Sequence, residues 1–252
     1  MKNNITSHAI KLMTIVLLHL AVMTAHGQRQ TVNQNNTWYM YFGNHALTDK
    51  WLIHTEYQFR RSGLIQDWQQ SLARIGLDYR FNKQVTLTAG YAYIVSFPYG
   101  ELPISEELDE HRIWQTLTVN QFFNGWILNH RYRLEQRWNE RSSSSEESGR
   151  IYRNRIRYRA MVTVPLTSKS MQKGTVFLSA YDEIFVGFGD NVAQPFDQNR
   201  LYFALGHQFS PTGNIQLGYL NQIALKSDGI NQEQNHTLML ALTYNLDFRK
   251  QD

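Results

Sequence analysis

The chain contains no cysteine, so neither a disulfide framework nor a thiolate metal site stabilises it. Its marked apolar run, residues 12–23, is too short to cross a bilayer as a helix and is interrupted by His19. There is no glycine-rich phosphate loop, no metal-binding histidine pair at helical spacing and no internal repeat beyond a β-hairpin pattern. Packing and backbone pairing must therefore stabilise the fold.

The apolar run belongs to an N-terminal segment with the pattern of a secretory signal. Lysines at positions 2 and 11 precede it, and the small-residue exit A-H-G ends the segment before Gln28. We therefore predict a cleaved signal peptide over residues 1–27 and a single exported domain over residues 28–252. A short N-terminal anchor is the alternative.

The exported domain has little net charge. The full chain has a formal net charge of +4, and residues 1–27 contribute Lys2 and Lys11 but no acid. We expect no nucleic-acid partner for an exported domain that is nearly neutral, although the pI of the whole chain is about 9.2.

From Trp38 onward, apolar and polar side chains alternate with a period of two to the end of the chain. Successive side chains of a strand point to opposite faces, so this pattern predicts β-strands. We identify eleven such segments, near residues 37–46, 50–61, 67–80, 84–97, 109–122, 125–138, 150–164, 174–186, 198–210, 213–226 and 235–248. Most are longer than the roughly 5–6 residues of globular strands and match the roughly 9–11 residues of strands that cross a bilayer.

The connectors between these segments alternate in length. Residues 47–50, 81–84, 122–125 and 210–214 are tight turns, whereas residues 98–108, 139–149, 187–197 and 226–234 are long and polar. The link 165–174 is the exception, because it is fairly long yet falls on the side of the tight turns. Outer-membrane barrels have short periplasmic turns and long outer loops, so we predict that the four long loops face outside.

The eleven segments conflict with the even number of strands that is usual for bacterial barrels. Single-chain bacterial barrels have an even number of strands, but segment 37–46 would start outside the cell if the C-terminus is periplasmic. Either residues 28–36 supply a twelfth strand or thread the lumen, or segment 37–46 is not a full strand. We predict an all-β fold, a single transmembrane antiparallel up-and-down β-barrel of about 12 strands, with 10 as the alternative.

A soluble barrel would bury its apolar face and expose its charged rows to water. Against that alternative, aromatic residues cluster toward the ends of the segments, as two interfacial girdles require. They are Trp38, Tyr39, Trp51, Trp68, Phe97, Tyr99, Phe122, Phe123, Trp126 and Trp138. We therefore predict a barrel in the outer membrane of a Gram-negative bacterium, in contact with its lipids and lipopolysaccharide.

One segment carries arginine at every second position from Arg153 to Arg159, and a strand places these side chains in one row. Segments 125–138 and 150–164 flank a loop, so we expect them to pair as a hairpin. In a symmetric register Arg137 faces Arg153, Glu135 faces Arg155, Arg133 faces Arg157 and Arg131 faces Arg159. An arginine that faces lipid costs about 2–4 kcal/mol near the midplane, so these eight residues form a predicted lumen charge cluster and a candidate anion-binding site.

The predicted lumen charge cluster contains seven arginines and one glutamate, so further anions are needed to neutralise it. Three sources are open: the acidic loop 98–110 folded inward as a plug, an anionic solute, or lumen acids such as Glu56, Asp78, Glu110 and either Asp182 or Glu183. We favour an internal ion-pair network over a true anion site, because a barrel of about twelve strands lies between packed eight-stranded and open sixteen-stranded barrels.

The C-terminal segment H-T-L-M-L-A-L-T-Y-N-L-D-F resembles the terminal strand that the barrel assembly machinery of the outer membrane recognises, although four residues follow Phe248. With W-Y-M-Y-F-G-N-H-A-L-T-D-K-W near its start and R-x-R-x-R-Y-R in its middle, the chain resembles a family of exported Gram-negative proteins known only as a domain of unknown function. The resemblance implies a barrel fold and an outer-membrane location, and it implies no activity.

Three functions stay open, in order of preference: a narrow pore or uptake component, a non-conducting structural or interaction barrel, and a lipid-modifying enzyme. None of His45, His54, His111, His130, His207 and His236 lies at a spacing from serine that suggests a nucleophile and its base, so we expect no enzyme, with a lipid hydrolase as the alternative. The loop acids lack the ligand ladder of a calcium site. We expect no metal, no cofactor and a monomer.

Overall fold

The structure is a computed structural model that describes residues 29–249. Eleven strands fill most of this range: β1 Gln30–Ala46, β2 Trp51–Ser62, β3 Trp68–Arg80, β4 Val85–Ser96, β5 Leu108–Phe122, β6 Ile127–Glu140, β7 Arg150–Pro165, β8 Val176–Phe188, β9 Phe196–His207, β10 Gly213–Leu225 and β11 Asn231–Tyr244. No helix in the described range is long and apolar enough to span a membrane. The predicted signal peptide lies outside the described residues.

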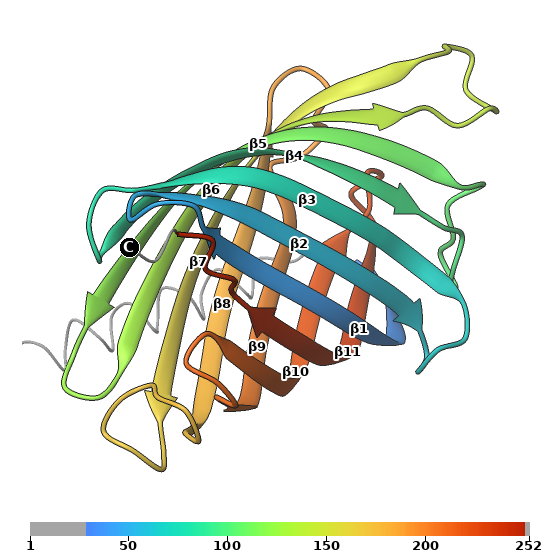
Figure 1. The fold of residues 1–252 in the computed structure, drawn as a ribbon. Helices are drawn as coiled ribbons and strands as arrows, with labels where there is room; N and C mark the ends of the chain where they lie inside the picture. Colours follow the sequence, from blue (N-terminus) through green and yellow to red (C-terminus); the bar gives the residue numbers. More distant parts are fainter. Residues whose placement is uncertain (1–28, 250–252) are drawn as a thin grey trace, which may run out of the picture. The chain divides into compact units, whose positions relative to one another are not determined.

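The strands form one closed barrel in which sequence neighbours are also neighbours in space. Every two strands that follow one another in the chain pair antiparallel. The barrel closes where β1 lies beside β11, the blue and dark red strands of Figure 1. The predicted all-β barrel is therefore confirmed.

The predicted strand number is wrong, because the described residues form eleven strands rather than twelve or ten. Residues 30–36 supply no separate twelfth strand and do not thread the lumen, because they belong to β1, which begins at Gln30; residue 28 lies outside the described residues. With an odd number, β1 and β11 run in the same direction. The Asn36 amide donates to Asn235 at 2.9 Å, and at the end of β1 Ala46 forms an isolated parallel bridge with Asp247, just beyond the end of β11. This parallel seam closes the barrel, so the even-number rule, which assumes antiparallel closure, does not apply.

The connectors sort by length between the two ends of the barrel. We call one the long-loop end, with loops 63–67, 97–107, 141–149, 189–195 and 226–230, and the other the short-turn end, with turns 47–50, 81–84, 123–126 and 208–212. The four loops predicted to be long all lie at the long-loop end. Link 166–175 lies at the short-turn end in spite of its length, as the sequence indicates.

The wall of the barrel has the reverse polarity of a soluble protein. Charged side chains are buried, such as Glu135 at 0% and Glu183 at 2% exposure, while apolar ones are exposed, such as Ile75 at 58% and Leu217 at 54%. Both sets follow from the same alternation, since one face of each strand lines the interior. The interior also holds apolar rings, with Trp38 and Trp114 almost completely buried.

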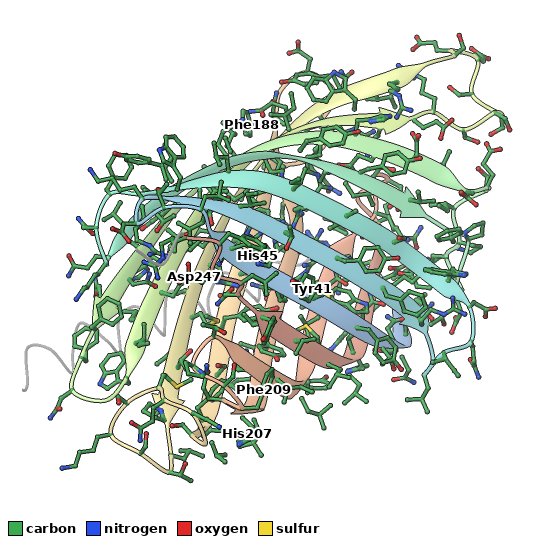
Figure 2. The ribbon with its side chains drawn as sticks, in the orientation of Figure 1. Tyr41, His45, Phe188, His207, Phe209 and Asp247 are labelled. Atoms are coloured by element: carbon green, nitrogen blue, oxygen red, sulfur yellow. The ribbon has the colours of Figure 1, made fainter. Side chains whose placement is uncertain are left out.

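Aromatic side chains gather near both ends of the outer wall. At the short-turn end, the rings of Phe123 and Trp126 stack at 4.0 Å. At the long-loop end, the rings of Trp138 and Tyr152 lie 5.2 Å apart. Figure 2 shows this distribution, with Phe188 at the end of β8 and Phe209 in the turn after β9. The two groups occupy the positions expected for girdles.

Candidate functional site in the barrel interior

Strands β6 and β7 pair in the predicted register. The pairs are Arg137 with Arg153, Glu135 with Arg155, Arg133 with Arg157, and Arg131 with Arg159. Arg133, Glu135, Arg155 and Arg157 are buried, whereas Tyr132 and Ile156 on the opposite face are exposed. We call these eight paired residues the arginine wall, and the structure places them on the interior face.

Glu135 is the centre of the arginine wall. Its carboxylate lies 2.6 Å from Arg155, 2.9 Å from Arg157 and 3.1 Å from Arg112 of β5. A fourth guanidinium group, that of Arg74 on β3, lies 3.5 Å away. Charge-assisted hydrogen bonds are the strong ones, and four cations around one buried anion form a network that connects four strands.

Three more carboxylates complete the network. Glu183 of β8 binds Arg131 at 2.7 Å and Arg157 at 2.8 Å, and Glu110 of β5 binds Arg137 at 2.8 Å. Asp197 of β9 binds Arg155 at 2.5 Å. Carboxylates on the interior faces of β5, β8 and β9 therefore neutralise much of the positive charge of the arginine wall.

Of the acids expected to face the wall, Glu110 and Glu183 do so and the others do not. Glu56 binds Arg74 at 2.8 Å, outside the wall. Asp78 forms no ion pair with arginine among the described residues, and Asp182 accepts a hydrogen bond from the Asn199 amide beside it.

Asp197 was not expected, because alternation from Gln198 and Arg200 places it on the outer face. The pairing of β8 with β9 shifts register at this point, so that Asp197 has no partner on β8. This bulge allows its side chain to point inward and bind Arg155. No periodicity in the sequence marks this bulge.

Loop 97–107 reaches into the interior with a tyrosine rather than with its acids. The Tyr99 hydroxyl donates to Glu233 at 3.0 Å and accepts from the Gln69 amide at 2.8 Å. Burial and the neighbouring Glu233 carboxylate raise the pKa of Tyr99. Glu106 instead accepts hydrogen bonds from Ser142 and Ser143 of the facing loop, which lower its pKa. Within the segment 98–110 expected as a plug, Glu110 binds the arginine wall from its place in β5, whereas the acids of loop 97–107 form no ion pair with the wall in the described range.

Sequence reasoning did not single out four further interior arginines, Arg60, Arg74, Arg112 and Arg200. Two of them lie over one ring: the guanidinium carbons of Arg60 and Arg200 are 3.8 and 5.0 Å from the centre of Trp38. Neither forms an ion pair with a carboxylate within residues 29–249. The alternation of β2 does place Arg60 on the interior face, so the position of this one arginine could have been predicted from the sequence.

A cavity of about 370 Å³ lies inside the barrel toward the long-loop end, and we call it the vestibule. Strands and the loop from Phe97 to Ile104 contribute to its lining, with Tyr99 and Glu233 on one side. Its arginines are Arg60, Arg74, Arg112, Arg137, Arg153, Arg155, Arg157 and Arg200, and its amides are Gln58, Gln69, Gln70, Asn139, Gln198, Gln222 and Asn235. Its carboxylates are Asp109, Glu110, Glu140 and Glu233. Arginines outnumber them, so the vestibule is rich in hydrogen-bond donors and carries an excess of positive charge.

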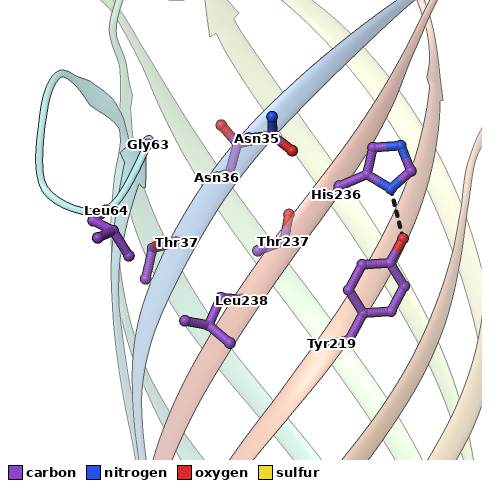
Figure 3. Close-up of a pocket in the computed structure, with 9 residues that line it drawn as sticks. All are labelled: Asn35, Asn36, Thr37, Gly63, Leu64, Tyr219, His236, Thr237 and Leu238. Atoms are coloured by element: carbon purple, nitrogen blue, oxygen red, sulfur yellow. Dashed lines mark hydrogen bonds between the residues drawn. The ribbon is translucent and has the colours of Figure 1, made fainter.

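A second cavity, of about 340 Å³, lies across the parallel seam near loop 63–67. Figure 3 shows Tyr219 and His236, whose hydroxyl oxygen and Nδ1 lie 2.6 Å apart. Tyr219 and Leu238 are exposed, so this cavity opens on the outer face.

The histidines of the described residues form no hydrogen bond with a serine side chain. Their hydrogen-bond partners among the side chains of the described range are Thr55, Asn44, Tyr91, Tyr158 and Tyr219. Two of them also lie near a carboxylate, His54 at 3.5 Å from Glu56 and His111 at 3.8 Å from Asp109. His45 lies 2.8 Å from the Thr55 hydroxyl, but its Nδ1 accepts from the Leu246 backbone. A neutral ring then carries its proton on Nε2 and donates to Thr55, so it cannot serve as the base for that hydroxyl. No metal-binding group of three or more His, Cys, Asp or Glu occurs in residues 29–249.

Residues 35–234 match the family model described as protein of unknown function (DUF2490). The chain belongs to this family. The matched DUF2490 region runs from β1 into β11, and so includes the arginine wall and most of the vestibule lining. No curated protein and no solved structure matches the chain.

Proposed function

We propose that this DUF2490 protein is an outer-membrane β-barrel whose interior is closed by side chains, so that it does not conduct. It is exported through the signal peptide predicted over residues 1–27. The single observation that supports closure is Glu135, which contacts arginines from β3, β5 and β7. Of the functions that the sequence leaves open, this arrangement favours the non-conducting interaction barrel over the pore.

The reversed polarity of the wall supports the membrane location. Large apolar side chains are exposed on ten of the eleven strands, β2 to β11, and monomeric soluble proteins rarely expose continuous apolar surfaces of this extent. In water this surface would drive aggregation, whereas in a bilayer it contacts acyl chains. The aromatic pairs near both ends suit the two interfaces between lipid and water.

The size of the barrel supports closure. Side chains can fill a barrel of eight strands, whereas sixteen strands leave an aqueous channel. Here the rings of Trp38, Trp114 and Phe185 are almost completely buried in the interior, and Arg74 reaches Glu135 across the β4 and β5 strands between them. Rings and ion pairs together occupy the middle of the lumen.

In the proposed orientation the long-loop end faces outside and the short-turn end faces the periplasm. The outer wall contacts outer-membrane lipids and lipopolysaccharide, and the protein is a monomer. The C-terminal strand would be recognised by the barrel assembly machinery: Leu242 and Tyr244 of β11, followed by Leu246 and Phe248, are exposed.

Two measurements test the proposal. Overexpressed protein should fractionate with the outer membrane and migrate differently on a gel before and after boiling, and recovery as a soluble periplasmic protein would refute the location. Purified protein should then give no steady conductance in planar bilayers. Reproducible anion-selective steps would refute closure and restore the pore.

A further inference from the structure

We propose that the vestibule binds a small oxyanion, a carboxylate or phosphate group of a soluble molecule, between Arg60 of β2 and Arg200 of β9. The arginine wall, where the sequence places the candidate anion site, is largely neutralised by carboxylates of the chain. Arg60 and Arg200 belong to other strands, and neither forms an ion pair with a carboxylate among residues 29–249.

The partners of the two arginines are neutral. Nε of Arg60 donates to the Gln58 side-chain oxygen at 3.0 Å, and Nε of Arg200 donates to that of Gln198 at 3.1 Å. Most other arginines of the vestibule have carboxylate partners; Arg153, which donates to the Asn191 carbonyl, is also without one in the described range. Burial of an unpaired charge is costly, and two cations over one ring repel each other. A bound anion would relieve both costs.

The two guanidinium groups are held in place. Trp38 is 1% exposed, and its indole nitrogen donates to Gln69 at 2.7 Å, so its ring forms a fixed support beneath both cations. A cation over an indole face is stabilised without losing its hydrogen-bond donors. Because the amides occupy the Nε positions, terminal nitrogens of Arg200 are left without protein partners among the described residues.

The chemistry of the lining indicates the rest of the ligand. Guanidinium forks match the geometry of carboxylate and phosphate. Neutral amides beside them, among them Gln222 and Asn235, donate and accept hydrogen bonds and suit hydroxyl groups. A cavity of about 370 Å³ lies at the lower end of the range for small-molecule sites. We therefore expect a compact anion with several hydroxyls, of the size of an acidic monosaccharide.

Binding can be measured by titration calorimetry on the folded full-length chain in detergent, with glucuronate and glucose 6-phosphate as probes and glucose as the uncharged comparison. At least one charged probe should bind and glucose should not. Arg200→Gln and Arg60→Gln should each weaken binding at least tenfold, since a hydrogen bond to a charged group contributes roughly 1.5–3 kcal/mol. This readout requires only the folded barrel, so it is independent of the conductance result.

The matched control is Arg61→Gln, which removes the same charge one residue away, where the side chain lies over the outer rings of Phe59 and Trp68. It should leave probe affinity within about twofold. Arg200→Lys keeps the charge but loses the fork, and should bind more weakly than the native chain and more tightly than Arg200→Gln. If neither charged probe binds the native chain, or if Arg61→Gln weakens binding as much as Arg60→Gln, the site is refuted.

Discussion

The arginines inside this barrel that contact carboxylates differ from those that lie over aromatic rings without a carboxylate partner, although Arg155 and Arg157 of the first group also lie over Phe185. Arg112, Arg155 and Arg157 of the first group meet the buried Glu135 carboxylate. In the second group Arg60 and Arg200 lie over Trp38, Arg133 lies over Trp114 and Arg159 lies over Tyr181, and none has an ion-pair partner among residues 29–249. The first group fastens strands together, whereas the second keeps its charge available. Only Arg60 and Arg200 of the second group line the vestibule.

Glu135→Gln should produce the largest effect, because it removes the one anion that four arginines share. Breaking a buried ion pair by removal of one partner typically costs about 3–5 kcal/mol. We expect a loss of unfolding free energy in this range, measured by urea unfolding of the chain in lipid vesicles. Glu140→Gln, at the exposed end of the same strand, is the control and should be nearly neutral. Equal stability of the two variants would show that the network does not hold the strands.

Arg157→Gln should produce a smaller effect, because the carboxylates it contacts keep other partners. Glu135 retains Arg155 and Arg112, and Glu183 retains Arg131. We expect a loss of about 1–3 kcal/mol in the same urea measurement. Arg159→Gln is the matched control, because it lies two residues along the same row but has no carboxylate partner, and it should cost less. The reverse order would contradict the division into two groups.

Arg200→Gln should change stability least among the interior substitutions. It loses contacts with the faces of Trp38 and Phe185, each worth roughly 0.5–2 kcal/mol, and it relieves repulsion from Arg60. These terms oppose each other, so the urea midpoint should shift by less than that of Arg157→Gln. A loss as large as that of Glu135→Gln would mean that Arg200 also fastens the barrel.

Acidification should affect the loops before the network. Hydrogen bonds from Ser143 and Ser142 lower the pKa of Glu106, so this contact is complete above the ordinary glutamate pKa of about 4.3 and is lost as pH falls through the lowered value. Hydrogen exchange in loop 141–149 should therefore increase at low pH while β6 stays protected. Glu106→Gln should show the faster loop exchange already at neutral pH. Simultaneous exposure of β6 would show that loop and network open together.

The repeated strands could be predicted from the sequence because alternation is local. The register of β6 with β7 could also be predicted, because a single loop connects these two segments and a symmetric hairpin about that loop fixes which residues face each other. Ion-pair partners across the interior could not be predicted. Arg74 and Glu135 come from strands that do not pair, and the alternation of side chains indicates only which face a residue occupies, not which residue it contacts across the lumen. The inward position of Asp197 could not be predicted because it depends on a bulge. The strand number could not be predicted because it depends on the pairing of β1 with β11.

The odd strand number places Gln30 and Tyr244 at opposite ends of the barrel. In the proposed orientation the first strand begins at the cell surface, and the last one finishes in the periplasm. A barrel with an even number of strands passes only its outer loops through the bilayer during assembly and keeps both chain ends on the side of entry. This barrel must also carry one free end across. In that orientation, reporter tags fused at the two ends should mark different compartments, one on each side of the proposed membrane.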